Sequence, residues 1–399
     1  MTGKLSSQTT LDAIAGFTNG GAWNQTEYSD EGVPVVRVTD IKKETVDLSA
    51  CKFLPKSSLG KYARHTLRAG DLVICTVGSH PTQPGSVVGR AAVVPASADG
   101  ALLNQNAVCI RSSSPDVDQS WLGYLGRSQD FHDYIISCAR GSASQVRMAI
   151  GLLKEMPVKV PPLCVQQRIA GVLSAYDELI ENSQRRIKIL ESMARSLYRE
   201  WFVHFRFPGH ANHPYVVSSL GEIPQGWEVK SLLELTKVNY GKNLPSKKLA
   251  DDGAHPVYGA AKIIGRYTEY TREQRTIICG CRGSVGEMQI TEPQCFVTNN
   301  SFTFDPVHSD NFFWLFHTLK ERGLRDVVGG AAQPQITLEG ISSVELVTPP
   351  LPLRTRYQQT VLAMFEQAWA LDSQIQNLRR TRDLLLPRLL SGQINMEAL

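Results

Sequence analysis

Two stretches of the chain share one spacing of apolar positions, in which steps of four and three residues alternate. The first stretch carries the apolar positions Ile169, Leu173, Tyr176, Ile180, Ile187, Leu190, Ala194, Leu197 and Trp201. The second carries Tyr357, Val361, Met364, Ala368, Leu371, Ile375, Leu378, Leu385 and Leu389. Ser183 and Arg382 are the two polar residues on these stripes. A sustained four-three alternation is the period of a coiled coil, so the pattern predicts two long helices that pair with each other.

The two predicted helices belong to a long internal repeat. Each follows a short apolar run that ends in Pro-Pro, and Pro349 follows Pro161 by 349 − 161 = 188 residues. The same shift of 188 residues converts the first stripe into the second, and the prolines prevent either helix from starting earlier. Glycines at positions 209 and 392 suit the ends of the helices. Each helix should contain about 33 residues and be roughly 50 Å long.

The segments outside the helices alternate strand-like and helix-like patterns. Residues 33–38 and 302–304 have strand character, whereas residues 121–125 and 311–319 have helix character. We therefore predict an α+β protein with a pseudo-two-fold internal repeat, in which two mixed α/β globular domains are separated by two helices of an antiparallel coiled coil. The expected boundaries are 1–160 for the first globular domain, 161–207 for the first helix, 208–348 for a linker and the second globular domain, and 349–399 for the second helix and tail.

Composition narrows the class of protein. At 399 residues, with 42% hydrophobic and 20% charged residues, the chain fits two or three folded units. The eight cysteines are scattered without a C-x-x-C pair, which indicates reduced core thiols. No run of eighteen apolar residues occurs and the N-terminus is polar, so we expect a cytoplasmic protein without membrane contact. The net charge of +4 permits nucleic-acid binding but does not argue for it.

The arrangement resembles the specificity subunits of type I restriction-modification systems over essentially the whole chain. Three segments carry the resemblance. Residues 32–41 (GVPVVRVTDI) are similar to an early strand motif of the first target-recognition domain, and residues 221–227 (GEIPQGW) to the entry of the second. Residues 378–392 (LRRTRDLLLPRLLSG) are similar to the closing helix of the family, and they are the most specific of the three.

This resemblance implies a non-catalytic subunit that reads a bipartite DNA target. Each globular domain would contact one half of the target, and the helices would set the distance between the halves. The implied partners are double-stranded DNA, two methyltransferase (modification) subunits and restriction subunits. The resemblance implies no cofactor in this chain, whereas the partner subunits would use S-adenosylmethionine, ATP and Mg²⁺.

Two kinds of residue are candidates for DNA contact. Asparagine and glutamine side chains can pair with adenine, and they occur with a serine in polar loops at Asn104, Gln105, Asn106, Ser144, Gln145, Asn299, Asn300, Gln333 and Gln335. Basic residues near aromatic ones could hold phosphates, at Lys61, Arg64, Tyr258, Lys262, Arg266 and Arg282. The alternatives are ordinary turn chemistry for the loops and a solvated surface for the basic clusters.

The coiled-coil interface is assigned to the stripes themselves. Its members are Ile169, Leu173, Tyr176, Ile180, Ile187, Leu190, Leu197, Tyr357, Val361, Met364, Leu371, Ile375, Leu378 and Leu385. The arginines beside the stripes are expected to be solubilising or to form pairs between the helices. Arg382 lies on the stripe and indicates a polar contact that fixes the register.

Other classes of function find little support in the sequence. There is no phosphate-binding loop of the form G-x-x-x-x-G-K-[ST], no well-placed G-x-G-x-x-G, and no cluster with the ligand spacing of a metal site. No paired nucleophile and base stands at a recognisable spacing, which disfavours a hidden hydrolase. The main alternative is a coiled-coil scaffold with two protein-binding domains and no DNA specificity, for which association should be insensitive to salt.

Overall fold

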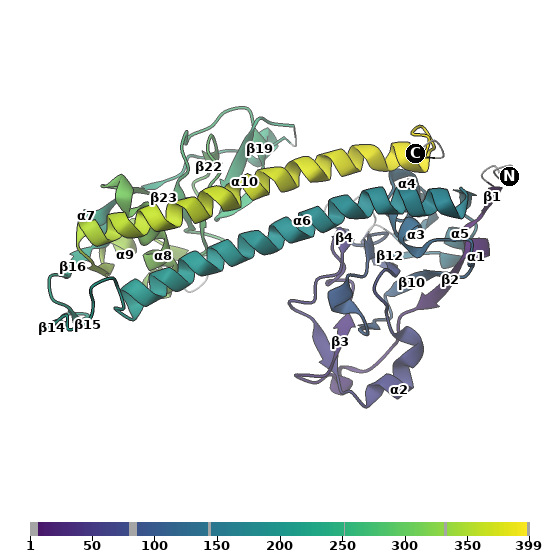
Figure 1. The fold of residues 1–399 in the computed structure, drawn as a ribbon, viewed down its shortest axis with the longest axis horizontal. Helices are drawn as coiled ribbons and strands as arrows, with labels where there is room; N and C mark the ends of the chain where they lie inside the picture. The colour runs from purple at the N-terminus through teal and green to yellow at the C-terminus, as the bar shows by residue number, and fades with distance from the viewer. Residues whose placement is uncertain (1–6, 80–85, 143–144, 251, 331–332, 397–399) are drawn as a thin grey trace. The chain divides into compact units, whose positions relative to one another are not determined.

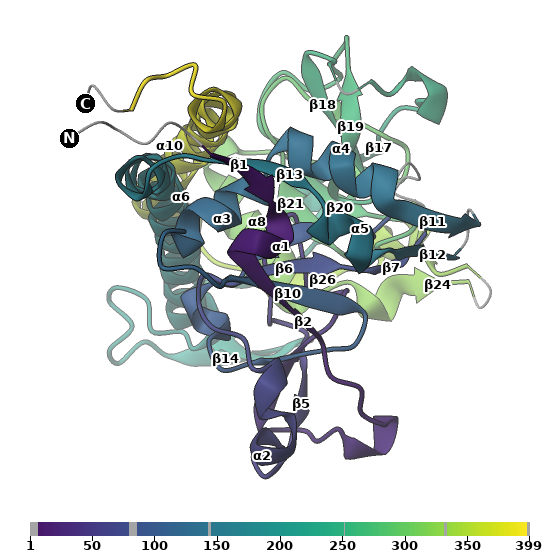
Figure 2. The same ribbon diagram turned by 90° about the vertical axis from the view of Figure 1, so that its right-hand side faces the viewer.

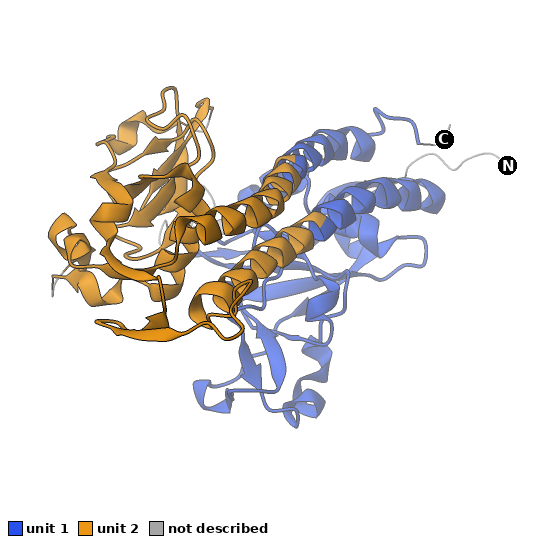
Figure 3. Cartoon of the chain, turned by 60° about the vertical axis from the view of Figure 1, so that its left-hand side comes forward, with its two compact units in different colours: residues 1–182, 374–399 blue, residues 183–373 orange. Residues whose placement is uncertain are grey.

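The chain forms two compact units that divide both long helices between them. The computed structural model describes residues 7–79, 86–142, 145–250, 252–330 and 333–396. Unit 1 comprises residues 1–182 and 374–399, and unit 2 comprises residues 183–373 (Figure 3). Two long helices, α6 (Leu163–Tyr198) and α10 (Leu351–Leu390), each contribute one half to each unit. Unit 1 therefore combines two separate stretches of sequence, whereas unit 2 is one continuous stretch that begins within α6 and ends within α10.

The main sheet of unit 1 has five strands (Figures 1 and 2). Their order is β2 (Ala15–Asn19), β10 (Ala107–Ser112), β6 (Leu72–Cys75), β8 (Ala91–Val93) and β4 (Glu44–Thr45). Two three-stranded sheets have the orders β5 (Lys52–Leu54), β3 (Val33–Val36), β9 (Leu102–Leu103) and β11 (Ala139–Ser142), β12 (Gln145–Met148), β7 (Val77–Gly78). A further pair joins β1 (Ser7–Thr10) to β13 (Pro157–Val160). The short helices are α1 (Leu11–Ile14), α2 (Ser58–Tyr62), α3 (Gln119–Leu125), α4 (Gln129–Cys138) and α5 (Ile150–Lys154).

In the described residues, unit 2 repeats this plan with one strand fewer in its main sheet. The order there is β17 (Thr236–Tyr240), β23 (Ser301–Pro306), β20 (Ile277–Gly280) and β21 (Met288–Ile290). A three-stranded sheet has the order β19 (Lys262–Tyr267), β18 (His255–Gly259), β22 (Phe296–Val297). Further strand pairs join β24 (Val328–Gly329) to β25 (Gln335–Ile336), β14 (Tyr215–Ser218) to β15 (Gly221–Pro224), and β16 (Glu228–Ser231) to β26 (Glu345–Thr348). The short helices are α7 (Leu232–Leu235), α8 (Phe312–Arg322) and α9 (Leu338–Ser342).

The duplication extends to individual backbone contacts. The N–H of Gly20 donates to Ala107 O at 2.9 Å in unit 1, and the N–H of Gly241 donates to Ser301 O at 3.0 Å in unit 2. A Cβ atom at Gly20 would lie 1.9 Å from Asn104 O, and a Cβ atom at Gly241 would lie 2.2 Å from Thr298 O. Glycine is needed at both positions because any larger residue would push Asn104 and Thr298 away.

The two long helices run antiparallel. In unit 1 the end of α10 lies beside the start of α6, where Arg382 is bonded to Asp177, and in unit 2 the hydroxyl of Tyr357 donates to Ala194 O at 3.1 Å. Every residue assigned to the interface from the sequence is buried or half-buried. The predicted antiparallel helix pair is therefore present in the α+β repeat.

The predicted stripes of the helix pair also contact the globular cores. Ile169 and Leu173 share a core with Trp121 and Phe131 of the globular part of unit 1, and with Leu389 of α10. The four-three stripe of each helix thus faces a globular core as well as the other helix.

An aromatic core surrounds Tyr357 in unit 2. The rings of Tyr198, Phe202 and Tyr357 lie 5.1–6.2 Å apart between centroids, and His317 stacks on Tyr198 at 5.7 Å. The Nδ1 atom of His317 lies 2.9 Å from Phe313 O and 3.0 Å from the Tyr357 hydroxyl. Burial lowers the pKa of His317 to about 4, because the interior disfavours the imidazolium.

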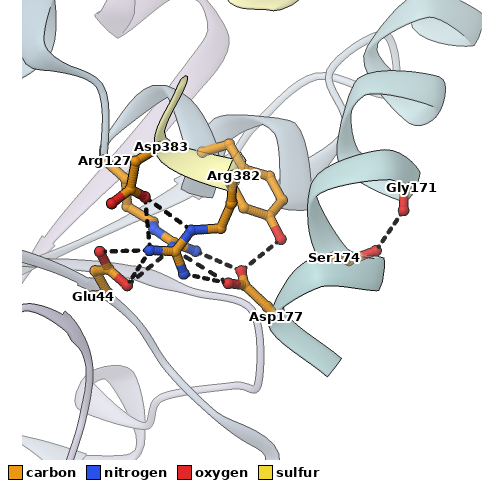
Figure 4. A network of polar contacts seen from close by, with 8 residues as sticks. Glu44, Arg127, Gly171, Ser174, Asp177, Arg382 and Asp383 are labelled. Atoms are coloured by element: carbon orange, nitrogen blue, oxygen red, sulfur yellow. Dashed lines mark hydrogen bonds and ion pairs between the residues drawn. The ribbon is translucent and has the colours of Figure 1, made fainter. Parts of the chain in front are cut away.

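A cluster of ion pairs joins α10, α6 and the globular part of unit 1 (Figure 4). The guanidinium of Arg382 lies 2.5 Å from Asp177 of α6 and 2.8 Å from Glu44 of β4. Arg127 contacts the same two carboxylates at 2.7 and 3.2 Å, and the Tyr124 hydroxyl donates to Asp177 at 2.8 Å. Burial alone would raise the pKa of Asp177, but the hydrogen bonds from the two arginines outweigh it and lower the pKa overall. We call Glu44, Tyr124, Arg127, Asp177 and Arg382 the polar cluster.

The polar cluster should be strongly coupled. Arg382→Ala would leave Asp177 and Glu44 short of positive charge and is expected to destabilise unit 1 by about 3–5 kcal/mol. The repeat of 188 residues places Ala194 of unit 2 at the position of Arg382, and Phe365 of unit 2 at the position of Asp177. The double variant Asp177→Phe/Arg382→Ala, which copies this apolar pair, should therefore lose less stability than the two single variants together. Urea unfolding of the three variants measures this, and additive losses would contradict coupling.

Buried His317 should make unit 2 sensitive to acid. Its pKa is lower in the folded chain than the unfolded value of about 6.5, so the unfolded chain takes up the proton first as the pH falls. This contribution to stability is complete above pH 6.5 and decreases as the pH falls from about 6.5 to about 4. Thermal melts of the wild type and of His317→Phe across this range test it, because the variant should lose the corresponding part of the pH dependence. Parallel curves for the two proteins would rule the effect out.

Candidate DNA-recognition surfaces

Three segments meet in unit 1 at the end of strand β6. The N–H of Thr76 donates to Asn106 O at 2.8 Å, and Thr76 O accepts from the N–H of Met148 at 2.9 Å. The turn Asn104–Asn106, strand β7 and strand β12 therefore lie side by side, and β7 and β12 are adjacent in Figure 2. Gln105 is exposed, whereas Asn104 and Asn106 are half-buried. We call these three segments the hairpin surface of unit 1.

Unit 2 builds the same surface at the end of β20. The N–H of Cys281 donates to Asn300 O at 2.9 Å, and Cys281 O accepts from the N–H of Ile336 at 3.0 Å. Arg282 is exposed, and its Nε donates to the Gln335 amide oxygen at 3.3 Å. Gln333 is exposed on the same segment. The hairpin surface of unit 2 thus brings Asn299, Asn300, Arg282, Gln333 and Gln335 together.

The structure changes the alignment of the two asparagine turns by one residue. In unit 1 the N–H of Ala107 donates to Asn104 O at 3.2 Å, and the corresponding bond in unit 2 runs from Ser301 to Thr298 O at 3.1 Å. Asn104–Asn106 therefore corresponds to Thr298–Asn300. A match of the asparagines alone pairs it with Asn299–Ser301, because the sequence does not show which residue closes the turn.

The basic residues predicted in unit 1 lie on and after helix α2. Lys61 is exposed and forms an ion pair with Glu27 at 2.9 Å. The Asn24 N–H, then Lys61 and the Tyr62 hydroxyl, lower the pKa of Glu27 to about 2. Arg64 is exposed, and the next residue, His65, lies 2.8 Å from Asn19 O. Arg64 is thus available to a phosphate, whereas Lys61 already has an anionic partner.

The predicted basic and aromatic residues of unit 2 are more dispersed. Tyr258 is 1% exposed and its hydroxyl accepts from the Glu292 N–H at 3.0 Å, so its assignment to DNA contact needs correction. Arg266 donates to Gly253 O and Ala254 O, both at 2.6 Å, and stabilises that loop. Lys262 is exposed on β19. Residues 256–259 of β18 are all buried, so both faces of this strand are covered, and nothing local in the sequence showed this.

Sequence reasoning missed basic residues at the hairpin surfaces. Arg147 is exposed in β12 and pairs in register with Val77 of β7 and Arg140 of β11. In unit 2, Lys242 is exposed and its carbonyl accepts from the Asn299 N–H at 3.1 Å. The alternation of Arg147 between buried Val146 and Met148 was a signal for an exposed strand position. Nothing local in the sequence placed Lys242 beside Asn299.

The predictions for Ser144 and Gln145, for membrane contact and for metal binding can be compared with the described residues only. Ser144 lies outside the described residues, and Gln145 is the first residue of β12. Across the described part of the chain, no helix has the length and apolar character to cross a membrane. The same residues contain no group of three or more histidine, cysteine, aspartate or glutamate side chains that could hold a metal ion.

The comparisons with known proteins agree with the repeated plan. The model of the type I restriction modification DNA specificity domain matches residues 9–192 and 224–380. The specificity subunit of the type I restriction enzyme MjaIX of Methanocaldococcus jannaschii is 26% identical over 306 residues, which cover 71% of each chain. The HindI specificity subunit of Haemophilus influenzae is 22% identical, with 86% of this chain and 91% of the relative covered.

A solved structure shares the fold along the whole chain. The S subunit of a type I restriction-modification system from M. genitalium superposes with a TM-score of 0.57 at 19% identity, and the match covers 98% of this chain and 99% of the other. Because the family model spans most of both halves of the repeat, the chain belongs to the family of type I restriction-modification DNA specificity domains.

Proposed function

We propose that this chain is the DNA-recognition subunit of a type I restriction-modification complex and reads one half of a bipartite target with each hairpin surface. The proposal rests on the observation that each unit builds the same surface from three segments around one residue, Thr76 or Cys281. Exposed side chains there include Gln105, Arg147 and Arg282. Such residues suit base edges in the major groove and phosphates beside them.

The long helices support a split target. With 36 and 40 residues, α6 and α10 are about 54 and 60 Å long at 1.5 Å per residue. One turn of B-DNA spans about 34–36 Å, so helices of this length are sufficient to separate two readers by a full turn. The base pairs between the two half-sites would then be unread.

Chemistry would be left to partner subunits. In this proposal the chain is non-catalytic and directs methyltransferase and restriction subunits, which bind S-adenosylmethionine, ATP and Mg²⁺. The pseudo-two-fold repeat supports two methyltransferase subunits, because each half of the repeat offers an equivalent surface. A scaffold without DNA specificity is less consistent with membership of a DNA specificity family.

A methylation map tests the bipartite reading. Cells that express this chain with its methyltransferase subunit should show adenine methylation at one split motif in single-molecule sequencing. Replacing the unit 2 hairpin surface (298–300, 282–284 and 333–335) with that of a relative should change one half of the motif and leave the other half intact. A soluble complex that methylates no motif would contradict the proposal, and a change in both halves would contradict the division between units.

Substitutions in the hairpin surfaces should separate phosphate contacts from base contacts. In the complex, Gln335→Ala should cost about 1–3 kcal/mol of discrimination at one base of a half-site. Arg147→Ala should weaken binding to all duplexes and reduce the slope of log affinity against log salt by about one unit. Lys159→Ala, which removes an exposed charge on β13 outside this surface, is the control. If all three variants bind alike, the hairpin surfaces do not contact DNA.

A further inference from the structure

The main sheets of the two units correspond residue by residue, except at one edge. In unit 1, β8 pairs with β6 so that Val93 faces Leu72, and in unit 2, β21 pairs with β20 so that Ile290 faces Ile277. Beyond β8, unit 1 adds β4 as a parallel fifth strand. Among the described residues of unit 2, the sheet ends at β21.

The missing strand has a cause in the sequence. In unit 1 the connection from β3 to β5 runs through residues 37–51 and carries β4 on its way. In unit 2 the equivalent connection, from β18 to β19, consists of Ala260 and Ala261. Both alanines have positive φ, 49° and 61°, as a two-residue hairpin turn requires. The shorter connection leaves no chain at this point to cover β21.

The edge of β21 exposes strand-pairing groups. The N–H of Thr291 donates to Thr276 O at 3.0 Å, and the N–H of Gly280 donates to Glu287 O at 2.9 Å. Because an antiparallel ladder alternates the direction of its backbone groups, the N–H and C=O of Met288 and Ile290 point away from β20. An unpaired edge of this kind accepts an added strand.

A cavity of about 660 Å³ lies against this edge, inside unit 2. Its walls include β21, the α10 residues Phe365 and Trp369, and Ile263, whose side chain is 51% exposed. The corresponding place in unit 1 is occupied by Glu44 of β4 and its partners in the polar cluster (Figure 4). The chain therefore fills this place with its own strand in one unit and leaves it open in the other.

The lining of the cavity carries both basic and acidic residues, and Lys320 among them is placed to receive an acidic side chain. Trp121 of unit 1 and Trp314 of unit 2 are equivalent buried tryptophans. Arg127 follows Trp121 by 127 − 121 = 6 residues, and Lys320 follows Trp314 by the same number, 320 − 314 = 6. Lys320 thus stands where Arg127 binds Glu44 in unit 1. Its side chain is exposed, and it forms no ion pair with any residue that the structure describes. Its ammonium lies 5.1 Å from the centre of the Phe316 ring.

We propose that the open edge of β21 receives an extended segment of a partner protein, which adds to the sheet of unit 2 as a fifth strand parallel to β21 and places an acidic side chain beside Lys320. The backbone of the segment would bond to Met288 and Ile290, and its apolar side chains would pack on Ile263 and Trp369. This surface is separate from the hairpin surface at the end of β20, so it remains available to a protein while DNA is bound.

A peptide that copies residues 38–49 of this chain, VTDIKKETVDLS, is the probe, because this segment covers the same edge in unit 1. Added to the full-length chain, it should slow amide exchange at Met288 and Ile290 about tenfold and leave Gln289, which already bonds to β20, unchanged. Residue-resolved hydrogen exchange measures this. A bound peptide without protection at β21, no binding at all, or the same protection by a DNA duplex would overturn the proposal.

Charge exchange tests the acidic position. Lys320→Glu should weaken peptide binding about tenfold, or ~1.4 kcal/mol, and a peptide with Glu44→Lys should restore it. Lys237→Glu is the matched control, since Lys237 is exposed on β17 at the opposite edge of the same sheet. Met288→Pro removes one outward N–H from the edge and should also abolish binding. Should that variant fail to fold, the charge exchange still decides, and equal losses in Lys320→Glu and Lys237→Glu would refute the assigned site.

Discussion

The structure depends on the sharing of two long helices between two hydrophobic cores. Ile169 and Leu173 of α6 share the core of unit 1 with Leu389 of α10, and Tyr198 of α6 shares the core of unit 2 with Tyr357 of α10. Each core therefore needs residues from both halves of the sequence repeat. Burial of these side chains links the folding of each unit to the antiparallel arrangement of the helices, so neither helix can be regarded as a passive connector.

This sharing explains why sequence periodicity predicted the helices well and their packing less well. The four-three steps identified both helices and the residues on their inner faces, because the periodicity of a buried face is recorded in the sequence. The same steps did not show that Trp121 and Phe131 of the globular part also press on that face. A stripe of apolar residues specifies that a face is buried but not what buries it. The contribution of the globular residues to the burial of the stripes could not be predicted for this reason.

The candidate site was predictable in its residue types and not in its assembly. Asparagine, glutamine and arginine drew attention to repeated polar loops, and the structure unites these loops around Thr76 and Cys281. The one-residue change in the alignment of the asparagine turns, and the burial of Tyr258, follow from hydrogen bonds between segments far apart in the sequence. Long-range pairing of this kind leaves no local periodic signal, whereas an exposed strand position such as Arg147 does.

The differences between the two halves of the repeat matter as much as their likeness. Arg382 and Asp177 of unit 1 stand where unit 2 has Ala194 and Phe365, so the two ends of the helix pair are chemically distinct. If the end of α10 were placed against the wrong half of α6, Arg382 would be buried beside apolar side chains without its carboxylates, at a cost of several kcal/mol. The polar cluster therefore selects one alignment of the helices, which a purely apolar stripe repeated every seven residues would leave ambiguous. The repeat supplies two similar readers, and its departures from symmetry determine which end of each helix belongs to which reader.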